Sequence, residues 1–343
     1  MKHFLNSDIE IILQNTKDIR NYFQNKKILI TGGNGFLGKY IVEIFRKYNE
    51  EFKKPLKLTV LDKNVSKRKI DRNIEIIKKD LSKPFFTKKK YDVIIHAAGI
   101  ASPFYYRKKP LETIEVTIEG IKNCLELAKK NKSKLIYFST SEIYGNPDRS
   151  NVPTKEGYNG NVSSMGPRSC YDESKRLGET YCYIHNNYFN THTNIIRPFN
   201  VYGPGMKQND YRIFPNFISD ILSKKHLKIY GSGNQTRTYC YITDAIEGFL
   251  RVIVLGKSGE AYNIGNTKPE ISVRNIVKIL KKINGSKIKS KIINYPASYP
   301  EDEPIRRCPN LSKANKDLRY YPKISLEKGL KNYLLWARDN YKY

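Results

Sequence analysis

Short apolar runs alternate with longer amphipathic segments over the first two hundred residues. The runs read "KILIT" at 27–31, "KLTVLD" at 57–62, "IEIIKKD" at 74–80, "YDVIIHAA" at 91–98 and "KLIYFST" at 134–140, with helical patterns at about 35–48 and 111–130. Continuous apolar strands separated by helices are typical of a parallel sheet covered on both faces. The pattern therefore predicts an α/β protein with a doubly wound parallel (Rossmann) sheet.

The composition of the chain changes after "TNIIRPFNVYGP" at 193–204, where the expected elements become shorter and Pro, Gly and Tyr become more frequent. This change predicts a smaller C-terminal α/β domain laid over the carboxyl ends of the strands. We expect residues 26–200 plus about 238–264 to form the dinucleotide-binding domain, and residues 201–237 plus about 265–343 to form the second domain.

Residues 1–25 precede this pattern as an N-terminal extension. Apolar side chains at Ile9, Ile12 and Ile19 lie close to a helical stripe over residues 7–24, and Ser7 followed by Glu10 has the spacing of a capping box. We expect an amphipathic helix that begins at Ser7 and packs on the outside of the first domain.

Composition narrows the class of protein. The chain has 343 residues without an apolar run long enough to span a membrane or to act as a secretory signal, so we expect a cytoplasmic protein. Its five cysteines are far apart and form no C-x-x-C pair, and its five histidines do not cluster. This spacing argues against a disulfide framework and a zinc site, and we expect no metal.

The formal net charge of +29 admits nucleic acid as a partner, because Lys and Arg neutralise phosphates. The lysines, however, are spread along the whole chain rather than gathered in one basic arm. We therefore expect no nucleic-acid partner, although an RNA-binding or dinucleotide-binding scaffold without catalysis stays an alternative.

The stretch "ILITGGNGFLG" ends the first strand and opens a helix. Gly32 allows a tight turn, Gly35 lets the backbone approach a pyrophosphate, and Gly38 allows close packing of helix on strand. Phe36 and Leu37 begin the helix, whose N-terminus favours the anion. This arrangement predicts a dinucleotide cofactor.

An acid follows at the end of the second strand. Asp62 lies about 20 residues downstream of the glycines, where a carboxylate binds the hydroxyls of the adenosine ribose and disfavours a 2′-phosphate. NAD is therefore the expected cofactor, with Lys63 and Arg68 as the residues that leave NADP open. Four further residues at strand ends are expected to contact the cofactor: Asp80, Leu81, Ala97 and Ala98, although Asp80 could instead cap a turn.

Tyr171 and Lys175 in "CYDESKR" are four residues apart and so share one face of a helix. An ammonium near a phenol lowers a pKa that starts at about 10, which would prepare Tyr171 as a general base. Upstream, "STSE" places Thr140, Ser141 and Glu142 directly after an apolar strand. These five residues are the candidate catalytic group.

The motifs TGGxGFLG, HAAG, STSExYG, YxxxK and RPFNxYGP occur in this order. Over residues 26–340 the chain resembles the extended short-chain dehydrogenase/reductase family of nucleotide-sugar enzymes. Within that family, "GPRSCYDESKR", "YGSGNQTRTYCYITD" and "RRCPNLSKA" are most similar to UDP-glucuronate decarboxylases, which make UDP-xylose.

The resemblance implies several roles. Thr140 or Ser141 would bind the 4-hydroxyl of the sugar beside Tyr171, and Lys175 would also contact NAD. Arg307 would face the sugar carboxylate or the glycosyl diphosphate, with its neighbour Arg306 as an alternative. The remaining substrate contacts would come from Tyr106, Asn200, Arg212, Arg237 and Tyr241. The resemblance also implies a homodimer held by the helices around 111–130 and 171–190.

The implied reaction begins with oxidation at carbon 4 by NAD, which turns a uronate into a β-keto acid that loses carbon dioxide. A 4,6-dehydratase of dTDP- or UDP-hexoses shares the first step, but that branch of the family has Thr-Asp-Glu where this chain has Thr140-Ser141-Glu142. The 4-epimerases usually have small or neutral residues at the position of Glu142. Decarboxylation is thus the leading hypothesis, and dehydration and epimerisation are the alternatives.

Overall fold

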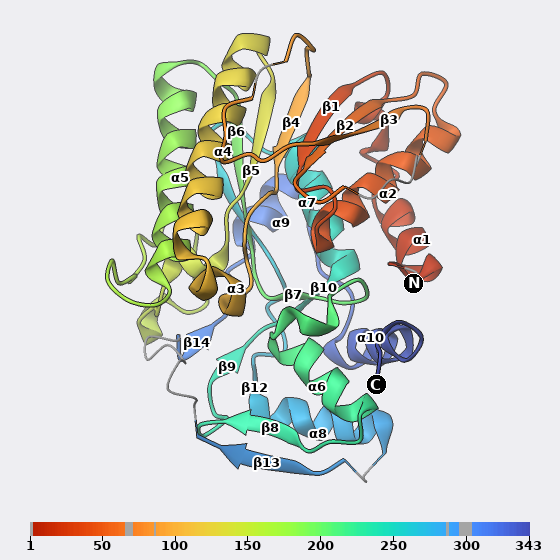
Figure 1. The fold of residues 1–343 in the computed structure, drawn as a ribbon, viewed down its shortest axis with the longest axis vertical. Helices are drawn as coiled ribbons and strands as arrows, with labels where there is room; N and C mark the ends of the chain where they lie inside the picture. Colours follow the sequence, from red (N-terminus) through yellow and green to blue (C-terminus); the bar gives the residue numbers. More distant parts are fainter. Residues whose placement is uncertain (1–2, 66–70, 86, 286–287, 295–303) are drawn as a thin grey trace.

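A seven-stranded sheet forms the centre of the computed structural model, which describes residues 3–65, 71–85, 87–285, 288–294 and 304–343 (Figure 1). Its strands run in the order β11-β6-β5-β4-β1-β2-β3, and every neighbouring pair is parallel. They are β1 (Lys27–Thr31), β2 (Lys57–Asp62), β3 (Ile74–Lys78), β4 (Val93–His96), β5 (Lys134–Phe138), β6 (Thr193–Pro198) and β11 (Ala261–Ile264). The predicted doubly wound sheet is confirmed.

Alternate residues of the strands face two separate cores. Ile28 and Ile30 of β1 belong to the cluster that includes α2 (Phe36–Glu51) and α7 (Ile242–Leu255), whereas Leu29 belongs to the cluster that includes α4 (Pro110–Asn131). Helix α5 (Ser169–Tyr188) packs alongside α4. Both faces of the sheet are therefore covered, which explains why its strands read as continuous apolar runs.

Strand register places the polar strand ends at one edge. Thr31 at the end of β1 lies opposite Leu61 on β2 and His96 on β4. The strand order reverses between β1 and β4, because β2 follows on one side and β4 on the other. In open parallel sheets a ligand crevice forms at such a reversal.

Shorter elements lie beyond the carboxyl ends of the strands (Figure 1). They include three small sheets, of order β10-β7, β12-β9-β14 and β13-β8. Their strands are β7 (Val201–Tyr202), β8 (Leu227–Tyr230), β9 (Thr236–Arg237), β10 (Cys240–Tyr241), β12 (Ile271–Ser272), β13 (Ser290–Ile293) and β14 (Arg306–Arg307). The remaining helices are α3 (Pro103–Lys108), α6 (Ile213–Leu222), α8 (Val273–Asn284), α9 (Ser312–Leu318) and α10 (Leu326–Asn340), with 3-10 turns η2 (Ser141–Tyr144), η3 (Arg149–Asn151) and η4 (Gln208–Asp210).

The N-terminal extension differs from the prediction of one helix over 7–24. Helix α1 spans Asn6–Asn15 and a separate 3-10 turn, η1, spans Arg20–Phe23. Ser7 lies inside the first turn of α1, so the prediction that it begins the helix was wrong; Leu5 holds the N-cap position without a side-chain bond. The helix stops at Asn15, and the hydroxyl of Thr16 donates to the carbonyl of Ile12.

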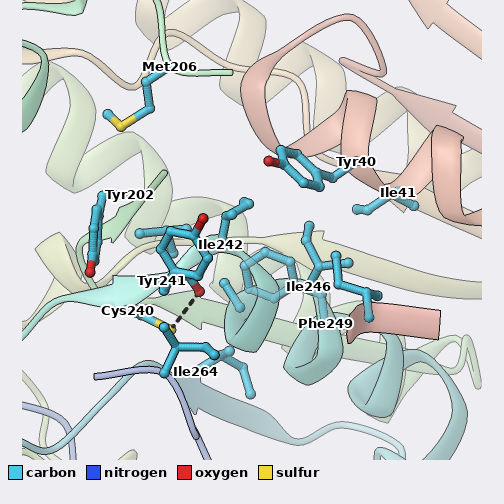
Figure 2. Packing of buried hydrophobic residues seen from close by; sticks show 14 of the residues in the cluster. Tyr40, Ile41, Tyr202, Met206, Cys240, Tyr241, Ile242, Ile246, Phe249 and Ile264 are labelled. Carbon is cyan, nitrogen blue, oxygen red and sulfur yellow. Dashed lines mark hydrogen bonds between the residues drawn. The ribbon is translucent and has the colours of Figure 1, made fainter. Parts of the chain in front are cut away.

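Helix α1 packs against α7 and α2 and buries an acid against the core. Both oxygens of Asp8, a fully buried residue, accept from the hydroxyl of Tyr241, at 3.0 and 2.9 Å. Figure 2 shows Tyr241 among the apolar side chains of this core, with Tyr202, Ile242 and Ile246 around it. Across the described residues, every helix is too short or too polar to cross a membrane.

Candidate functional site

The glycine-rich loop after β1 fits a cofactor that needs close backbone approach. Gly32 has a φ of +73°, and a Cβ there would lie 2.7 Å from the backbone of Ala98. A Cβ at Gly38 would lie 2.3 Å from the carbonyl oxygen of Gly32. Gly35 is the N-cap of α2, so the helix N-terminus begins at Phe36 and Leu37, beside the loop. These contacts leave no room for a side chain at Gly32 or Gly38, and the N-terminus of α2 beside them is suited to a pyrophosphate.

Hydrogen bonds join the ends of β1 and β4 at the reversal of strand order. The hydroxyl of Thr31 lies 2.8 Å from Nδ1 of His96 and accepts from the backbone amide of Ala98 at 3.3 Å. The backbone amide of Ala97 donates to the carbonyl of Thr31 at 3.2 Å. The predicted cofactor residues Gly32, Ala97 and Ala98 are thus brought together.

The two strand-end acids have different surroundings. Asp62 accepts from the backbone amides of Asn34 at 3.0 Å and Asn64 at 2.9 Å, which links the glycine loop to the end of β2. Asp80 pairs with Lys63 at 2.8 Å, and this hydrogen bond is the main reason that its pKa falls to about 2. Asp80 also accepts from Ser82, as expected of a residue that caps a turn.

A hollow of about 350 Å³ lies at these strand ends, lined by Lys63, Lys78, Lys79, Asp80 and Lys83. Leu81, which follows Asp80 in the sequence, is buried. The four lysines that line this hollow would attract the 2′-phosphate of NADP, so a preference for NAD must come from other groups, such as Asp62. Arg68, the other basic residue considered above, lies outside the described residues.

Tyr171 and Lys175 share one face of α5, and burial acts against the expected lowering of the pKa of the phenol. Burial raises the pKa of Tyr171 to about 12, and a hydrogen bond with Thr140 opposes this rise. The Lys175 ammonium instead donates to the carbonyl of Phe138 at 2.7 Å. Burial lowers the pKa of Lys175 to about 8. A Cβ at Gly99, after the end of β4, would lie 3.6 Å from this ammonium, which places it at the cofactor crevice.

The segment "STSE" turns sharply after β5. The hydroxyl of Thr140 accepts from the backbone amide of Glu142 at 3.2 Å and so caps η2. Ser141 is buried, with a 2% exposed surface. Because Thr140 bonds both Tyr171 and the amide of Glu142, the three candidate residues lie together.

Glu142 is the centre of an ion cluster. Arg307 donates to both carboxylate oxygens, with 2.7 Å between Nη2 and Oε2. Arg168 also donates to Oε2, and its Nε lies 3.3 Å from Asp172. Both arginines are about 6% exposed. Arg306 points elsewhere, to Glu270 at 2.8 and 2.7 Å, so Arg307 is the arginine of this pair that faces Glu142.

Other predicted substrate residues are distributed unevenly. Tyr106 stacks on Tyr171, with ring centroids 5.1 Å apart. Arg212 pairs with Asp210 and is close enough to Tyr171 to lower its pKa. Asn200, in a left-handed conformation with a φ of 41°, donates to the carbonyl of Thr238 at 2.8 Å.

Two predicted substrate residues have hydrogen-bond partners within the protein. Arg237 donates to the carbonyls of Thr236, Pro304 and Ile305, which braces β9 against β14. Tyr241 is fully buried and its hydroxyl is taken by Asp8, so the structure does not bring it to the site. Helix α1 of the extension supplies Asp8, the partner of this hydroxyl.

The sequence reasoning missed the residues that hold the "STSEIYG" turn. Arg197 on β6 pairs with Glu179 at 2.9 Å and donates to the hydroxyl of Tyr144 at 2.7 Å. Glu179 also accepts from Ser139. The two ends of the turn are thus fixed to one buried ion pair. The described residues contain no group of three or more His, Cys, Asp or Glu side chains suited to a metal ion.

Comparisons with known proteins identify the family. The profile of the NAD dependent epimerase/dehydratase family matches residues 28–265. UDP-glucuronic acid decarboxylase 6 of Arabidopsis thaliana is 35% identical over 322 residues, which cover 93% of this chain and 90% of the plant protein. UDP-glucuronic acid decarboxylase 1 of Xenopus tropicalis is 34% identical over 325 residues, or 93% of this chain and 73% of the frog protein.

Solved structures share the fold. UDP-glucuronic acid 4-epimerase from Bacillus cereus, in complex with UDP-glucuronic acid and NAD, superposes with a TM-score of 0.74 at 26% identity and covers 92% of this chain and 100% of that protein. The resemblance found in the sequence motifs is confirmed. The chain therefore belongs to the NAD-dependent epimerase/dehydratase family, and it is an enzyme whose cofactor is NAD.

Proposed function

We propose that this enzyme decarboxylates UDP-glucuronate to UDP-xylose through a 4-keto sugar. The observation that supports it most is the pair of Arg307 and Glu142, which Thr140 joins to Tyr171, because a planar guanidinium can receive a sugar carboxylate near the base. The similarity to two UDP-glucuronic acid decarboxylases over nine-tenths of the chain supports the same substrate.

The cofactor residues would be those of the glycine loop and strand ends, with Lys175 and Tyr171 at the nicotinamide end. When bound there, NAD supplies an acceptor and later a donor of the carbon-4 hydride. Tyr171 takes the proton from the 4-hydroxyl, helped by its hydrogen bond with Thr140. Burial raises the pKa of Tyr171, and the nearby guanidinium groups of Arg212 and Arg168 oppose that rise, which favours the phenolate that accepts the proton.

The hydroxyls of Thr140 and Ser141 would stabilise the oxygen on carbon 4. Once that carbon is a ketone, loss of carbon dioxide from carbon 5 leaves its electron pair in an enolate. Donors aimed at the enolate oxygen lower the barrier to this step. Tyr171 returns its proton when the ketone is reduced again, so the cycle has no net redox change.

Glu142 has two possible parts in this cycle. As a carboxylate near the departing carboxylate, Glu142 can destabilise the bound substrate by like charge. Alternatively, it takes a proton from solvent and delivers that proton to carbon 5, where it replaces the lost carbon dioxide. Glu142→Gln keeps the shape and removes both, so we expect decarboxylation to fall by roughly 100-fold or more. Unchanged decarboxylation by this variant would exclude both parts.

Epimerisation is the alternative that the comparisons keep in view, since a 4-epimerase that binds UDP-glucuronic acid shares the fold. Dehydration is disfavoured by Ser141 in place of an acid. Incubation of the pure protein with UDP-glucuronate, followed by mass spectrometry, separates the three. We expect a UDP-pentose; a product of unchanged mass, or turnover of dTDP-glucose alone, would contradict the proposal.

A homodimer is also part of the proposal. On α5, Leu177, Ile184 and Tyr188 lie on one face together with the partly buried Tyr181, and on α4 the exposed Leu111 and Ile114 continue it. Ile121 and Leu125, also on α4, are fully buried within the chain and do not belong to this face. Two copies could pair these apolar faces as a four-helix contact. Light scattering at micromolar concentration should give twice the mass of 39.9 kDa.

We further infer a reducing, cytoplasmic compartment and two functional lobes. All five cysteines are free, and four of them are buried.

Strand β11 joins the large sheet, which supports a cofactor lobe of residues 26–200 plus about 238–264. Arg212 and Arg307, in contrast, belong to the shorter elements of residues 201–237 and 265–343, which would form the nucleotide-sugar lobe.

A further inference from the structure

Two guanidinium groups converge on one carboxylate oxygen at the site. Oε2 of Glu142 accepts from both Arg168 and Arg307, whereas Oε1 accepts from Arg307. The two arginines come from different parts of the fold. Arg307 is on the two-residue strand β14, and Arg168 is the N-cap of α5.

Arg168 is fixed to the helix that bears the catalytic pair. Its carbonyl accepts from the backbone amides of Tyr171 at 3.0 Å and Asp172 at 3.1 Å, and its side chain contacts the carboxylate of Asp172. Its position relative to Tyr171 is therefore set by one turn of helix. Arg307, in contrast, is held by strand pairing with β9 among the shorter elements.

The carboxylate of the substrate would compete with Glu142 for the guanidinium of Arg307. The planar fork of a guanidinium serves one carboxylate at a time in the bidentate geometry. If Arg307 receives the carboxylate of UDP-glucuronate, it gives up at least part of its contact with Glu142. Glu142, whose side chain is only 19% exposed, would then be a poorly solvated charge without a cation unless a second one stays.

We propose that Arg168 is a positioning residue. It keeps Glu142 in place when the guanidinium of Arg307 moves from Glu142 to the carboxylate of the substrate. This inference rests on the proposed function. Arg168 acts through Glu142 and does not touch the reacting atoms. It ties the acid to the same helix as Tyr171, so that both groups keep their relative position through the exchange.

A double-mutant cycle tests the inference, with Arg168→Gln, Glu142→Gln and the two combined. We expect Arg168→Gln to lower kcat about tenfold or more, with KM for UDP-glucuronate within about threefold of wild type. In the Glu142→Gln background the same change should add no further loss. The exposed Arg149 gives the matched control, and Arg149→Gln should leave both constants unchanged.

NAD content and Tm of each variant show whether the fold is kept. If Arg168→Gln does not fold, Arg168→Lys takes its place in the cycle, because it keeps the charge and loses the fork. Losses that add in the double variant, or an effect on KM alone, would overturn the inference while wild-type decarboxylation stands. A wild-type enzyme that releases no carbon dioxide would instead contradict the proposed function, and with it the exchange at Arg307.

Discussion

Tyr106 lies flat against Tyr171, with ring planes 6° apart and centroids separated by 5.1 Å. Tyr106 is on the short helix α3, before α4, and Tyr171 is in the first turn of α5. Among the described residues the buried hydroxyl of Tyr106 has no hydrogen-bond partner. The ring thus packs on the phenol that we propose as catalytic, and we expect its unpartnered hydroxyl to bind a ligand.

Variants of Tyr106 can separate these two roles. Tyr106→Phe keeps the stack and removes a buried polar group without a partner, so Tm should be equal or higher, while KM for the nucleotide sugar should rise about tenfold. Tyr106→Leu removes the stack and should lower kcat. Steady-state kinetics and thermal melts measure both. A Tyr106→Phe variant with the KM of wild type would show that the hydroxyl does not bind substrate.

Adjacent arginines on β14 should differ sharply in their effects. Arg307→Ala removes a buried charged donor and should lower kcat/KM for UDP-glucuronate by roughly 10- to 100-fold. Arg306→Ala breaks a partly exposed pair with Glu270 and should change kcat/KM by less than about threefold. Equal losses in the two variants would mean that the strand, and not the side chain of Arg307, is what the reaction needs.

The buried acid of the N-terminal helix predicts a pH dependence of stability. Burial raises the pKa of Asp8 to about 7, against opposing effects of Tyr241 and Lys328. The folded state therefore binds a proton more tightly than the unfolded state, and stability should fall as the pH rises from about 4 to 7. Asp8→Asn should remove this component.

Thermal melts of wild type and Asp8→Asn across that range give the measurement. The comparison is needed because burial also raises the pKa of Asp244, to about 6, and contributes a similar slope to both proteins. The interpretation fails if the difference in Tm between the two proteins is the same at pH 4 and pH 8.

Asp62 is predicted to decide between NAD and NADP in a lysine-rich setting. Asp62→Asn keeps an acceptor for the backbone amides of Asn34 and Asn64 but removes the negative charge. With four lysines nearby, this variant should bind NADP at least about tenfold better than wild type. Cofactor released by denaturation and separated by chromatography should be NAD in the wild type; NADP there would contradict the role given to Asp62.

Much of the sheet could be predicted from the sequence, because each strand is specified by its own short run of apolar residues. The run "KILIT" is β1 to the residue, and strands β2 to β5 begin within two residues of the expected starts. Parallel strands end at one edge, so the apolar runs also indicated where Gly32, Asp62 and Thr140 would gather.

The ion cluster could not be predicted in the same way. Glu142 and Arg307 are 165 residues apart, and Asp8 and Tyr241 are 233 apart, so no local pattern relates them. The i, i+4 spacing did place Tyr171 and Lys175 on one face. It could not show that the Lys175 ammonium would turn to the carbonyl of Phe138, because that depends on the neighbouring strand. Arg168 did have a signal: it is one helical turn before Tyr171 in a string already singled out.

The central claim is tested most directly by single-turnover decarboxylation of UDP-glucuronate labelled with carbon-13 in its carboxyl group. The wild type, with its bound NAD, should release labelled carbon dioxide in step with formation of UDP-xylose. Tyr171→Phe should bind the same sugar nucleotide and release carbon dioxide roughly 100-fold or more slowly. Retention of the label in a UDP-hexuronate product, or equal release by Tyr171→Phe, would contradict the account.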